Sequence, residues 1–481
     1  MREVSLKLSV LEKLGYSLGD LAANLIFQTL MTFLAFFYTD VYKIPAGTAS
    51  IIIFVGGFFG AFFNVVMGAI ADRTHTRWGK FRPWILWTSI PFGIMAMLAF
   101  STPAFGENGK IAYALITYFL LVIIYSANNL PYSALSGVIT GDMKERNSLS
   151  SYRFVAVMIA QFIIQVLLLP MVLIFGHGDK QTGFKIVMTF FAVTGVIFFI
   201  ITFLTTRERI VPAQSIKSSV GQDLTDLFKN KPWVIMLFVT VLVFVTLALK
   251  GGMYIYYFKY YLNGPAIAGF LENIGFVRFT HWLYRTTGFQ WPDDAATSGN
   301  SLFNASGIIF MIVGIMFSKP LADRFGKRDV FGVFLFLSAF FLFLFIFYSP
   351  EAIGWVFVTQ ILHGFFYGVT IPLLWAMIAD VADYSEWKNN RRATAIIFSA
   401  MIFGLKIGLS VGGALGAALL AKYGYIAEAP HQTDSTISGI KMSVSVYPCL
   451  LFVAGVILLA GYKINKKMEV VIETDLKQRR A

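Results

Sequence analysis

The sequence predicts an all-α membrane protein whose twelve transmembrane helices form two halves of six helices each. Three observations carry this prediction: the composition, the length of the apolar stretches and the distribution of the basic residues. Hydrophobic residues make up 57% of the 481 residues and charged residues only 14%. A soluble protein carries about a quarter of its residues as charged side chains. This chain has too little charge to cover a water-exposed surface, so its outer surface is expected to face lipid.

The apolar stretches give the number of helices. A helix needs about 20 mostly apolar residues to cross the hydrocarbon core of a bilayer. Twelve stretches qualify, and an even number places both termini on one side of the membrane. The first stretch is too long for the apolar region of a cleavable signal peptide, so none is expected. The expected spans are 16–38, 48–71, 83–101, 111–138, 152–175, 184–205, 233–261, 303–322, 330–349, 352–379, 394–421 and 443–463.

The basic residues give the orientation. Of the 39 lysines and arginines, 28 are assigned to the side of the N-terminus, 8 to the opposite side and 3 to spans, where the residues at span ends, Arg153, Lys185, Lys319 and Lys463, are counted with the adjoining loops. Because cytoplasmic loops carry the excess of basic residues, we expect a multi-pass protein of the cell inner membrane with both termini in the cytoplasm. The net charge of +13 then reflects orientation and attraction to anionic lipid headgroups, and no nucleic-acid partner is expected. The single cysteine, Cys449, excludes an intramolecular disulfide and a multi-cysteine metal site.

Polar stretches divide the chain. Residues 1–205 are expected to form the N-terminal six-helix half, and 206–232 a cytoplasmic connector. The C-terminal half is 233–481, with an outside insertion at 263–302 and a cytoplasmic tail from residue 464. Within the insertion, the stretch 270–285 has two interpretations, a short amphipathic helix or a surface loop lying at the membrane interface. The composition favours the loop.

The two halves repeat one another. The segment ADRTHTRWGKFRPW at 71–84 follows the second span, and PLADRFGKRD at 320–329 follows the eighth, so each half carries Ala-Asp-Arg just inside the membrane. Pro131 and Pro372 recur in the fourth and tenth spans. Parallel six-helix repeats are the layout of the major facilitator superfamily, whose substrate site lies between the halves near the midplane.

The repeated Asp-Arg pairs suit a conformational latch. Asp72 and Arg73 in one half, and Asp323 and Arg324 in the other, lie at cytoplasmic helix ends. There an aspartate can pair with basic residues of a neighbouring loop and release them when the halves rock. The alternative is that these charges only anchor the helix ends at the headgroups.

Four motifs, in order along the chain, identify a more specific resemblance. They are GDLAAN at 19–24, FFYTDV at 36–41, RWGKFRPW at 77–84 and ADVADYSEW at 379–387. The chain resembles the glycoside–pentoside–hexuronide:cation symporter family, which includes the melibiose permease and the xyloside and glucuronide carriers. The similarity extends over all twelve spans, and the 263–302 insertion has no clear counterpart. The resemblance implies uptake of a sugar or glycoside driven by Na⁺, H⁺ or Li⁺.

The resemblance also implies roles for individual residues. Arg153 and Lys406 fall where the melibiose permease has basic residues of its sugar and cation pocket. Asn24 and Asn129 fall where that permease has sugar-contacting aspartates, and an amide still offers a donor and an acceptor to hydroxyl groups. Family members also often have a basic residue at the position of Lys250, near the middle of the seventh span.

The second span departs from the family pattern. The family typically carries an arginine and two aspartates there, and the carboxylates form the cation site. This chain has Gly57, Gly60 and Asn64 at those places, which disfavours conventional Na⁺ coupling. Asn64 also belongs to a stripe of small residues with Gly56 and Gly68. Its role is therefore either contact with a coupling cation or packing against a neighbouring helix, and packing is favoured.

Two lysines within spans point to a cavity. An ionisable residue at the centre of a span costs about 2.5–3.5 kcal/mol on insertion scales and by default marks a pathway. Lys250 is followed by an aromatic run, and Lys406 lies roughly opposite a stripe of four glycines on the eleventh span. The alternative for both lysines is that they extend to the membrane interface. We expect Lys250 and Lys406 to line the cavity.

Other candidate residues lie on the tenth span. His363 and Tyr367 are one turn apart and share a face, so they either donate to sugar hydroxyls or form interhelical hydrogen bonds. Trp375 is a candidate for stacking on a sugar ring, with packing as its alternative. Asp380 and Asp383 share the inner end of this span and are expected to pair with the basic residues that follow them, Lys388, Arg391 and Arg392.

Acidic residues are few, which bears on coupling and on the substrate. If transport is proton-coupled, Asp20 is the first candidate to carry the proton and His363 the second. The cavity residues named above are basic or amide side chains, and they favour an anionic glycoside such as a uronide. The coupling ion, H⁺ or Na⁺, is the only cofactor expected.

The function expected is secondary active transport of a sugar or glycoside by alternating access. No ATP-binding motif is present, so a gradient must supply the energy. Two alternatives remain: a carrier of lysolipids or other amphiphiles, and a membrane-embedded enzyme. Against an enzyme, the spans contain no His-Glu-x-x-His motif and no serine–histidine arrangement of a hydrolase. The protein is expected to act as a monomer whose partners are a small sugar or glycoside and the lipid bilayer.

Overall fold

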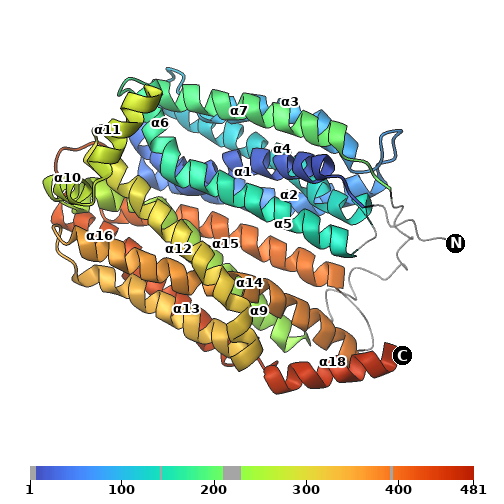
Figure 1. Cartoon of the computed structure of the whole chain (residues 1–481). Helices are drawn as coiled ribbons and strands as arrows, with labels where there is room; N and C mark the ends of the chain where they lie inside the picture. The colour runs from blue at the N-terminus through green and yellow to red at the C-terminus, as the bar shows by residue number, and fades with distance from the viewer. Residues whose placement is uncertain (1–6, 141–142, 210–228, 390–393, 481) are drawn as a thin grey trace. The chain divides into compact units, whose positions relative to one another are not determined.

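Helices account for nearly all regular structure in the described parts of the chain. The computed structural model describes residues 7–140, 143–209, 229–389 and 394–480, and within these ranges the only strand-like pairing is one isolated bridge between Thr76 and Gly79 (Figure 1). The chain divides into two units, Met1–Ser215 with Gln290–Pro292, and Ile216–Phe289 with Asp293–Ala481.

Unit 1 consists of six membrane-length helical segments, and Ser9 begins the first by accepting a hydrogen bond from the Glu12 amide at 3.1 Å. Asp179 begins the last of them in the same way, because its carboxylate accepts from the amides of Gln181 and Thr182. A hydrogen bond with the Thr182 side chain, together with these bonds from the amides, lowers the pKa of Asp179. The elements are α1 (Val10–Phe36) with η1 (Phe37–Val41), α2 (Ala46–Arg73), α3 (Arg82–Ala99), α4 (Glu107–Ile139), α5 (Met143–Phe162) with η2 (Ile163–Leu167) and α6 (Leu168–Phe175), and α7 (Lys180–Thr205).

Unit 2 contains two additions that the described part of unit 1 lacks, a pair of short helices in the insertion and a helix in the C-terminal tail. Its elements are α9 (Lys231–Tyr256) with η3 (Tyr257–Tyr261), α10 (Gly264–Asn273), α11 (Phe276–Thr287), α12 (Ala295–Phe325), α13 (Lys327–Leu344) with η4 (Phe345–Phe347), α14 (Ile353–Asn389), α15 (Thr394–Lys422), α16 (Asp434–Val444), α17 (Val446–Leu459) and α18 (Lys466–Arg480).

The predicted spans agree with these helices. Eleven helices of the described chain are long and apolar enough to cross a membrane. The predicted span 83–101 is α3, an 18-residue helix that contains Pro91 and packs against α4 and α7. The predicted twelfth span, 443–463, starts later than the helices that form it, because α16 and α17 together run over 434–459. The all-α membrane fold is therefore confirmed.

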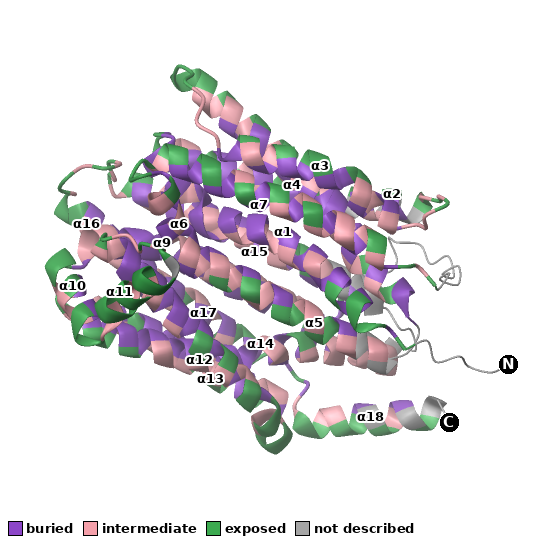
Figure 2. Cartoon of the chain, turned by 45° about the horizontal axis from the view of Figure 1, so that its top comes forward, coloured by how far each residue is buried: buried purple, intermediate pink, exposed green. Residues whose placement is uncertain are grey.

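Glycines set the closest helix contacts in both units. On α2, a Cβ added at Gly60 would lie 1.9 Å from a side-chain carbon of Val122 on α4. On α15, a Cβ at Gly412 would lie 2.3 Å from the carbonyl oxygen of Val245 on α9. The glycine stripe of the eleventh span is therefore a packing face, as small-residue stripes are in membrane helices. Buried residues concentrate where helices of the same unit face one another (Figure 2).

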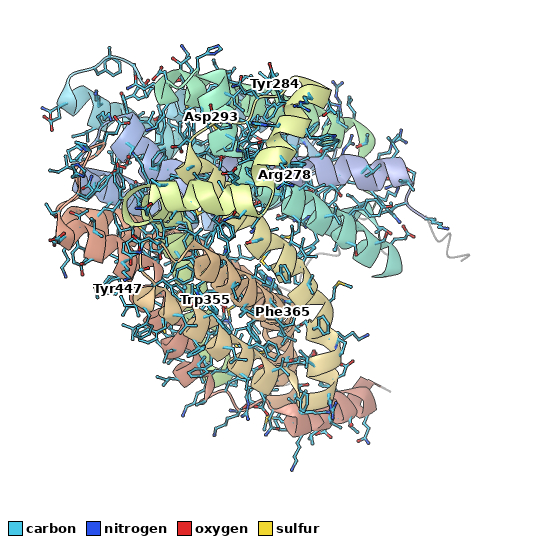
Figure 3. All side chains as sticks on the ribbon, turned by 60° about the vertical axis from the view of Figure 1, so that its left-hand side comes forward. Arg278, Tyr284, Asp293, Trp355, Phe365 and Tyr447 are labelled. Atoms are coloured by element: carbon cyan, nitrogen blue, oxygen red, sulfur yellow. The ribbon has the colours of Figure 1, made fainter. Side chains whose placement is uncertain are left out.

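The favoured interpretation of the insertion, a surface loop, is wrong. Residues 264–287 form α10 and α11, and α11 lies between Gly275 and Gly288, both in the left-handed conformation (φ 80° and 74°). Glycine adopts this conformation without the penalty of a side chain. Arg278 and Tyr284 project from α11 (Figure 3), and Tyr284 is 55% exposed.

Candidate functional site

A buried ion pair lies in the interior of unit 1. The carboxylate of Asp20 on α1 is 4% exposed, and it accepts a hydrogen bond from Nε of Arg153 on α5 at 2.8 Å. Asn24, one turn further along α1, donates its amide to the Asp20 carbonyl oxygen at 2.9 Å and to Oδ1 at 3.4 Å. The structure thus brings three predicted site residues together, and Asp20 neutralises the charge of Arg153 within this unit.

Two tyrosines fix the position of the Arg153 guanidinium. Its central carbon lies 5.7 Å from the ring centre of Tyr16 and 5.3 Å from that of Tyr132, within the range of a cation–π interaction. The two rings stack 4.6 Å apart, and each hydroxyl donates to the backbone carbonyl of the other residue. Sequence reasoning missed both tyrosines. The available signal was that Tyr16 precedes Asp20 by four residues and so shares its helix face.

The two asparagines of α2 and α4 differ in their partners. The Asn64 amide donates to the Gly60 carbonyl oxygen of its own helix at 2.7 Å. Asn129 is half-buried and makes no hydrogen bond to any described residue, so its amide is available to a ligand. The described residues contain no group of three or more His, Cys, Asp or Glu side chains that would hold a metal ion.

Unit 2 contains a buried lysine–histidine pair. Nζ of Lys250 on α9 lies 2.7 Å from Nε2 of His363 on α14, and the two residues are 8% and 1% exposed. Nδ1 of His363 lies 2.9 Å from the hydroxyl oxygen of Ser338 on α13, which can donate or accept, and 3.0 Å from the Ser338 carbonyl oxygen, which only accepts. We therefore assign the imidazole hydrogen to Nδ1, which leaves the Nε2 lone pair to accept from the Lys250 amino group.

Aromatic rings surround this pair. Lys250 Nζ lies 5.5 Å from the ring centre of Tyr254 and 6.0 Å from that of Tyr367. The His363 ring stacks on Tyr367 at 6.2 Å and on Phe452 at 6.4 Å. His363 and Tyr367 share a face as predicted, and the interhelical alternative holds for His363 because both of its nitrogens have partners on other helices. Among the described residues, no carboxylate pairs with Lys250.

The contacts described above for the Lys250–His363 pair include neither Lys406 nor Trp375, the remaining candidates of unit 2. Lys406 is half-buried on α15, whose glycines pack against α9. Trp375 is 36% exposed, so its side chain is not enclosed within unit 2, and its stacking role stays a prediction.

The predicted latch residues make no ion pairs within the described structure. The side chain of Asp72 lies outside the described residues, and Arg73 is exposed. Asp323 and Arg324 are also exposed, and their carbonyl oxygens accept hydrogen bonds from Nζ of Lys466 at 2.7 and 3.1 Å. The latch therefore stays a prediction for another conformation.

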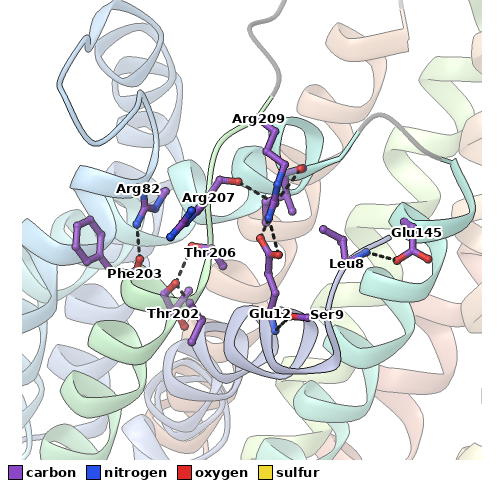
Figure 4. A network of polar contacts seen from close by, with 12 residues as sticks. Leu8, Ser9, Glu12, Arg82, Glu145, Thr202, Phe203, Thr206, Arg207 and Arg209 are labelled. Carbon is purple, nitrogen blue, oxygen red and sulfur yellow. Dashed lines mark hydrogen bonds and ion pairs between the residues drawn. The ribbon is translucent and has the colours of Figure 1, made fainter. Parts of the chain in front are cut away.

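Other residues tie together the end of unit 1 at which α1 begins and α7 ends. Arg209, after α7, donates to both carboxylate oxygens of Glu12 on α1 at 2.7 and 2.9 Å (Figure 4). The carboxylate of Glu12 raises the pKa of Arg209. Glu208 accepts hydrogen bonds from the backbone amides of Lys80, Phe81 and Arg82 at 2.7–2.9 Å, so it neutralises the N-terminal end of α3.

Asp380 has a partner that the sequence did not predict, so the expected pairing with Lys388 is wrong, while pairing with Arg391 or Arg392 stays a prediction. Its carboxylate pairs with Lys327 of α13, whose Nζ lies 2.5 Å from Oδ1 and 3.6 Å from Oε2 of Glu469 on α18. Arg391 and Arg392 lie outside the described residues. Lys327 is the partner because α13 packs along α14 and the first turn of α13, which contains Lys327, lies beside Asp380.

Comparison with known proteins decides the family. Residues 15–283 and 294–466 match the family model described as MFS/sugar transport protein. The chain belongs to this family. The predicted resemblance to glycoside–cation symporters of the major facilitator superfamily is confirmed, and the unmatched residues 284–293 lie within the insertion.

Curated relatives of this MFS/sugar transport chain are named as symporters or transporters. It is 36% identical to the inner membrane symporter YicJ of Escherichia coli, over 95% of this chain and 92% of the relative. It is 34% identical to the putative glycoside/cation symporter YagG of Escherichia coli, over 99% and 96%. It is 31% identical to the isoprimeverose transporter of Lactiplantibacillus pentosus, over 98% and 92%. The chain is thus a multi-pass inner membrane protein.

Solved structures confirm the MFS fold. The nucleoside transporter NupG, in its D323A mutant form, superimposes with a TM-score of 0.62 at 13% identity, over 94% of this chain and 100% of that one. A bacterial homologue of the lysosomal transporter Spinster gives a TM-score of 0.60 at 15% identity, over 94% and 95%.

Proposed function

We propose that the protein takes up a sugar or glycoside by secondary active transport, as a cation-coupled symporter that acts as a monomer with both termini in the cytoplasm. The observation that carries this proposal is the similarity to glycoside/cation symporters over nearly the full chain. Each unit also holds a buried cluster of charged and aromatic side chains where lipid-facing helices would have none. A transporter needs such groups and an inert scaffold does not.

An anionic glycoside is the substrate class that the charges favour. In unit 1, Asp20 compensates Arg153. In unit 2, no carboxylate among the described residues compensates Lys250. A positive charge in a low-dielectric interior attracts an anion more strongly than it would in water. A substrate carboxylate would therefore complete the charge balance that the protein leaves open.

The coupling ion proposed is H⁺. The second-span carboxylates of a Na⁺ site are absent from the sequence, and Asn64 directs its amide group to its own helix. A Na⁺ ion needs several oxygen ligands, preferably including a carboxylate. A titratable side chain suffices for a proton.

Counterflow in proteoliposomes tests the function. Vesicles loaded with unlabelled isoprimeverose, methyl β-xyloside or methyl β-glucuronide are diluted into the labelled compound, and transient accumulation is measured. We expect counterflow of at least one compound, recovered chemically unchanged, with the glucuronide preferred. Counterflow of none would contradict the transport proposal, while chemical conversion would favour an enzyme. Preference for the neutral xyloside would contradict the anionic preference alone.

A further inference from the structure

The Lys250–His363 pair lies at the depth of a membrane midplane. Lys250 precedes the end of η3 at Tyr261 by eleven residues, and His363 follows the start of α14 at Ile353 by ten. At 1.5 Å per residue both lie roughly 15 Å from the same end of unit 2. This is half of the roughly 30 Å hydrocarbon thickness. By the proposed orientation, that end faces the outside.

The geometry allows the pair to hold one added proton but not two. Nζ and Nε2 are 2.7 Å apart, so a charge on both nitrogens would place two cations in contact within a buried site. Ser338 holds the other imidazole hydrogen on Nδ1, which keeps the Nε2 lone pair directed at Lys250. The pair therefore alternates between neutral and singly charged, and one shared N–H···N hydrogen bond carries the proton.

No acidic group near this depth fixes the charge of the pair. The phenols of Tyr254 and Tyr367 face it. Among the described residues, the other helices packed against α9 and α14 contribute Lys406 on α15, Lys441 in the last turn of α16 and Cys449 in the first turn of α17, with no titratable group in the middle of α12 or α13. Every described Asp and Glu of these helices lies within three turns of a helix end. A proton is thus the group most directly able to change the charge of the pair.

Buried polar atoms without partners lie between the pair and the same end of the unit. They belong to three helices that pack on one another, α9 with η3, α12 and α14. By register, all lie between that end and the pair. Unpaired buried polar atoms are rare in proteins, and ordered water commonly satisfies them. The atoms are the hydroxyls of Tyr254 and Tyr257, Oδ1 of Asn300, Oγ of Ser301 and Oε1 of Gln360.

We propose that Lys250 and His363 together bind the proton that drives transport, and that water held by these polar atoms delivers it from the outer face. The proton forms an N–H bond with the neutral pair and gives it one positive charge. After the access change, that bond breaks, its electron pair stays on nitrogen, and the proton passes to cytoplasmic water. This inference rests on the proposed transport function, because the singly charged pair attracts the anionic substrate and each ligand strengthens binding of the other.

Three substitutions test the proposal: Lys250→Gln, His363→Gln, and Lys259→Gln as the matched control, a lysine on the continuation of the same helix. Two activities are measured in proteoliposomes for each variant. Exchange of labelled for unlabelled glycoside needs no net proton movement, whereas accumulation under an inward pH gradient does. Thermal unfolding in detergent checks that each variant folds, and Lys250→Arg, which keeps a permanent charge, supplies a second variant at that position.

Because the charged pair also attracts the substrate, we expect the Lys250 and His363 variants to exchange glycoside with a raised KM but a maximal rate within a few fold of wild type, and to lose pH-driven accumulation by about tenfold or more. The control should behave as wild type. Normal pH-driven accumulation in both Gln variants would overturn the proposal. Loss of exchange even at saturating glycoside, together with loss of accumulation, in every folded Lys250 and His363 variant, including Lys250→Arg, would also overturn it, because the pair would then be required for every transport step and not for the proton alone. Wild type that exchanges glycoside but accumulates it only with a Na⁺ gradient refutes proton coupling and leaves the transport function standing.

Discussion

The Asp20–Arg153 ion pair gives the sharpest prediction about stability. Breaking a buried ion pair by removing one partner costs about 3–5 kcal/mol, because the other charge stays buried. The two partners differ in burial: the side chain of Asp20 is 5% exposed and that of Arg153 is 27% exposed. Arg153→Met should therefore cost the full 3–5 kcal/mol of unfolding free energy, since it leaves a buried carboxylate whose remaining side-chain donor, Asn24, is 3.4 Å away.

The reverse substitution should cost less. Asp20→Asn leaves a guanidinium that keeps its contacts with the rings of Tyr16 and Tyr132 and reaches solvent, so we expect a loss of about 1–2 kcal/mol. The double variant has no unpaired charge. Its loss should fall below the sum of the single losses by about 2 kcal/mol or more.

A double-mutant cycle measures this coupling. The unfolding free energies of wild type, the two single variants and the double variant are obtained by reversible denaturant titration in mixed micelles, with helix content followed by circular dichroism. Single losses below about 0.5 kcal/mol that simply add would refute the view that the pair is buried and mutually compensating. The cycle involves unit 1 alone, so it does not depend on how the two units are arranged.

Three further predictions concern other contacts. Gly412→Val should lower the unfolding temperature and cost about 1–3 kcal/mol by overpacking, since even its Cβ would meet the Val245 carbonyl oxygen; an unchanged unfolding temperature argues against this helix contact. Glu208→Ala removes the acceptor of three backbone amides at α3 and should raise hydrogen exchange in segment 80–82 severalfold, and unchanged exchange would contradict the capping role. Burial raises the pKa of Glu469 above its ordinary value, so its contribution to docking of α18 is present at low pH and lost as pH rises through that raised pKa. Proteolysis of the tail should accelerate as pH rises through the pKa of Glu469, and Glu469→Gln should make the cleavage rate less dependent on pH. A wild-type cleavage rate that does not change with pH would exclude this contribution of Glu469 to the docking of α18.

The helices were predictable from sequence because apolar length is a local property. The glycine stripe on α15 also indicated a packing face before its partner was known, since small residues four apart always share a helix face. The insertion was harder. Alternation of aromatic and basic residues in 276–287 fits either a loop at the interface or a helix. The two glycines that flank α11, one at each end, indicate where a helix begins and ends, and composition alone does not reveal this.

The partners of the charged residues were less predictable, because they come from other helices. Asp20, Arg153, His363 and Lys250 were all recognised as candidates, but the pairs they form depend on tertiary packing that no spacing rule encodes. Sequence proximity suggested Lys388 for Asp380, whereas the packing of α13 on α14 supplies Lys327 instead. Ser338 carried no sequence signal, since its contribution includes a backbone carbonyl oxygen.

The structure also separates two charged clusters that look alike in the sequence. In unit 1 the arginine is compensated by an aspartate at 2.8 Å. In unit 2 the lysine faces an imidazole nitrogen at 2.7 Å and no carboxylate of the described residues, and we propose that one proton sets its charge. This difference moves the expected proton carrier from Asp20, the first candidate, to the pair that contains His363.

Proton movement measured together with sugar entry tests the central claim most directly. Labelled methyl β-glucuronide is added to a lightly buffered suspension of proteoliposomes, and external pH is recorded while uptake is counted. We predict that the medium becomes more alkaline as the glycoside enters, and that Lys250→Gln abolishes the pH change while exchange continues. Entry of the glycoside into wild-type vesicles with no change in external pH would contradict proton-coupled transport.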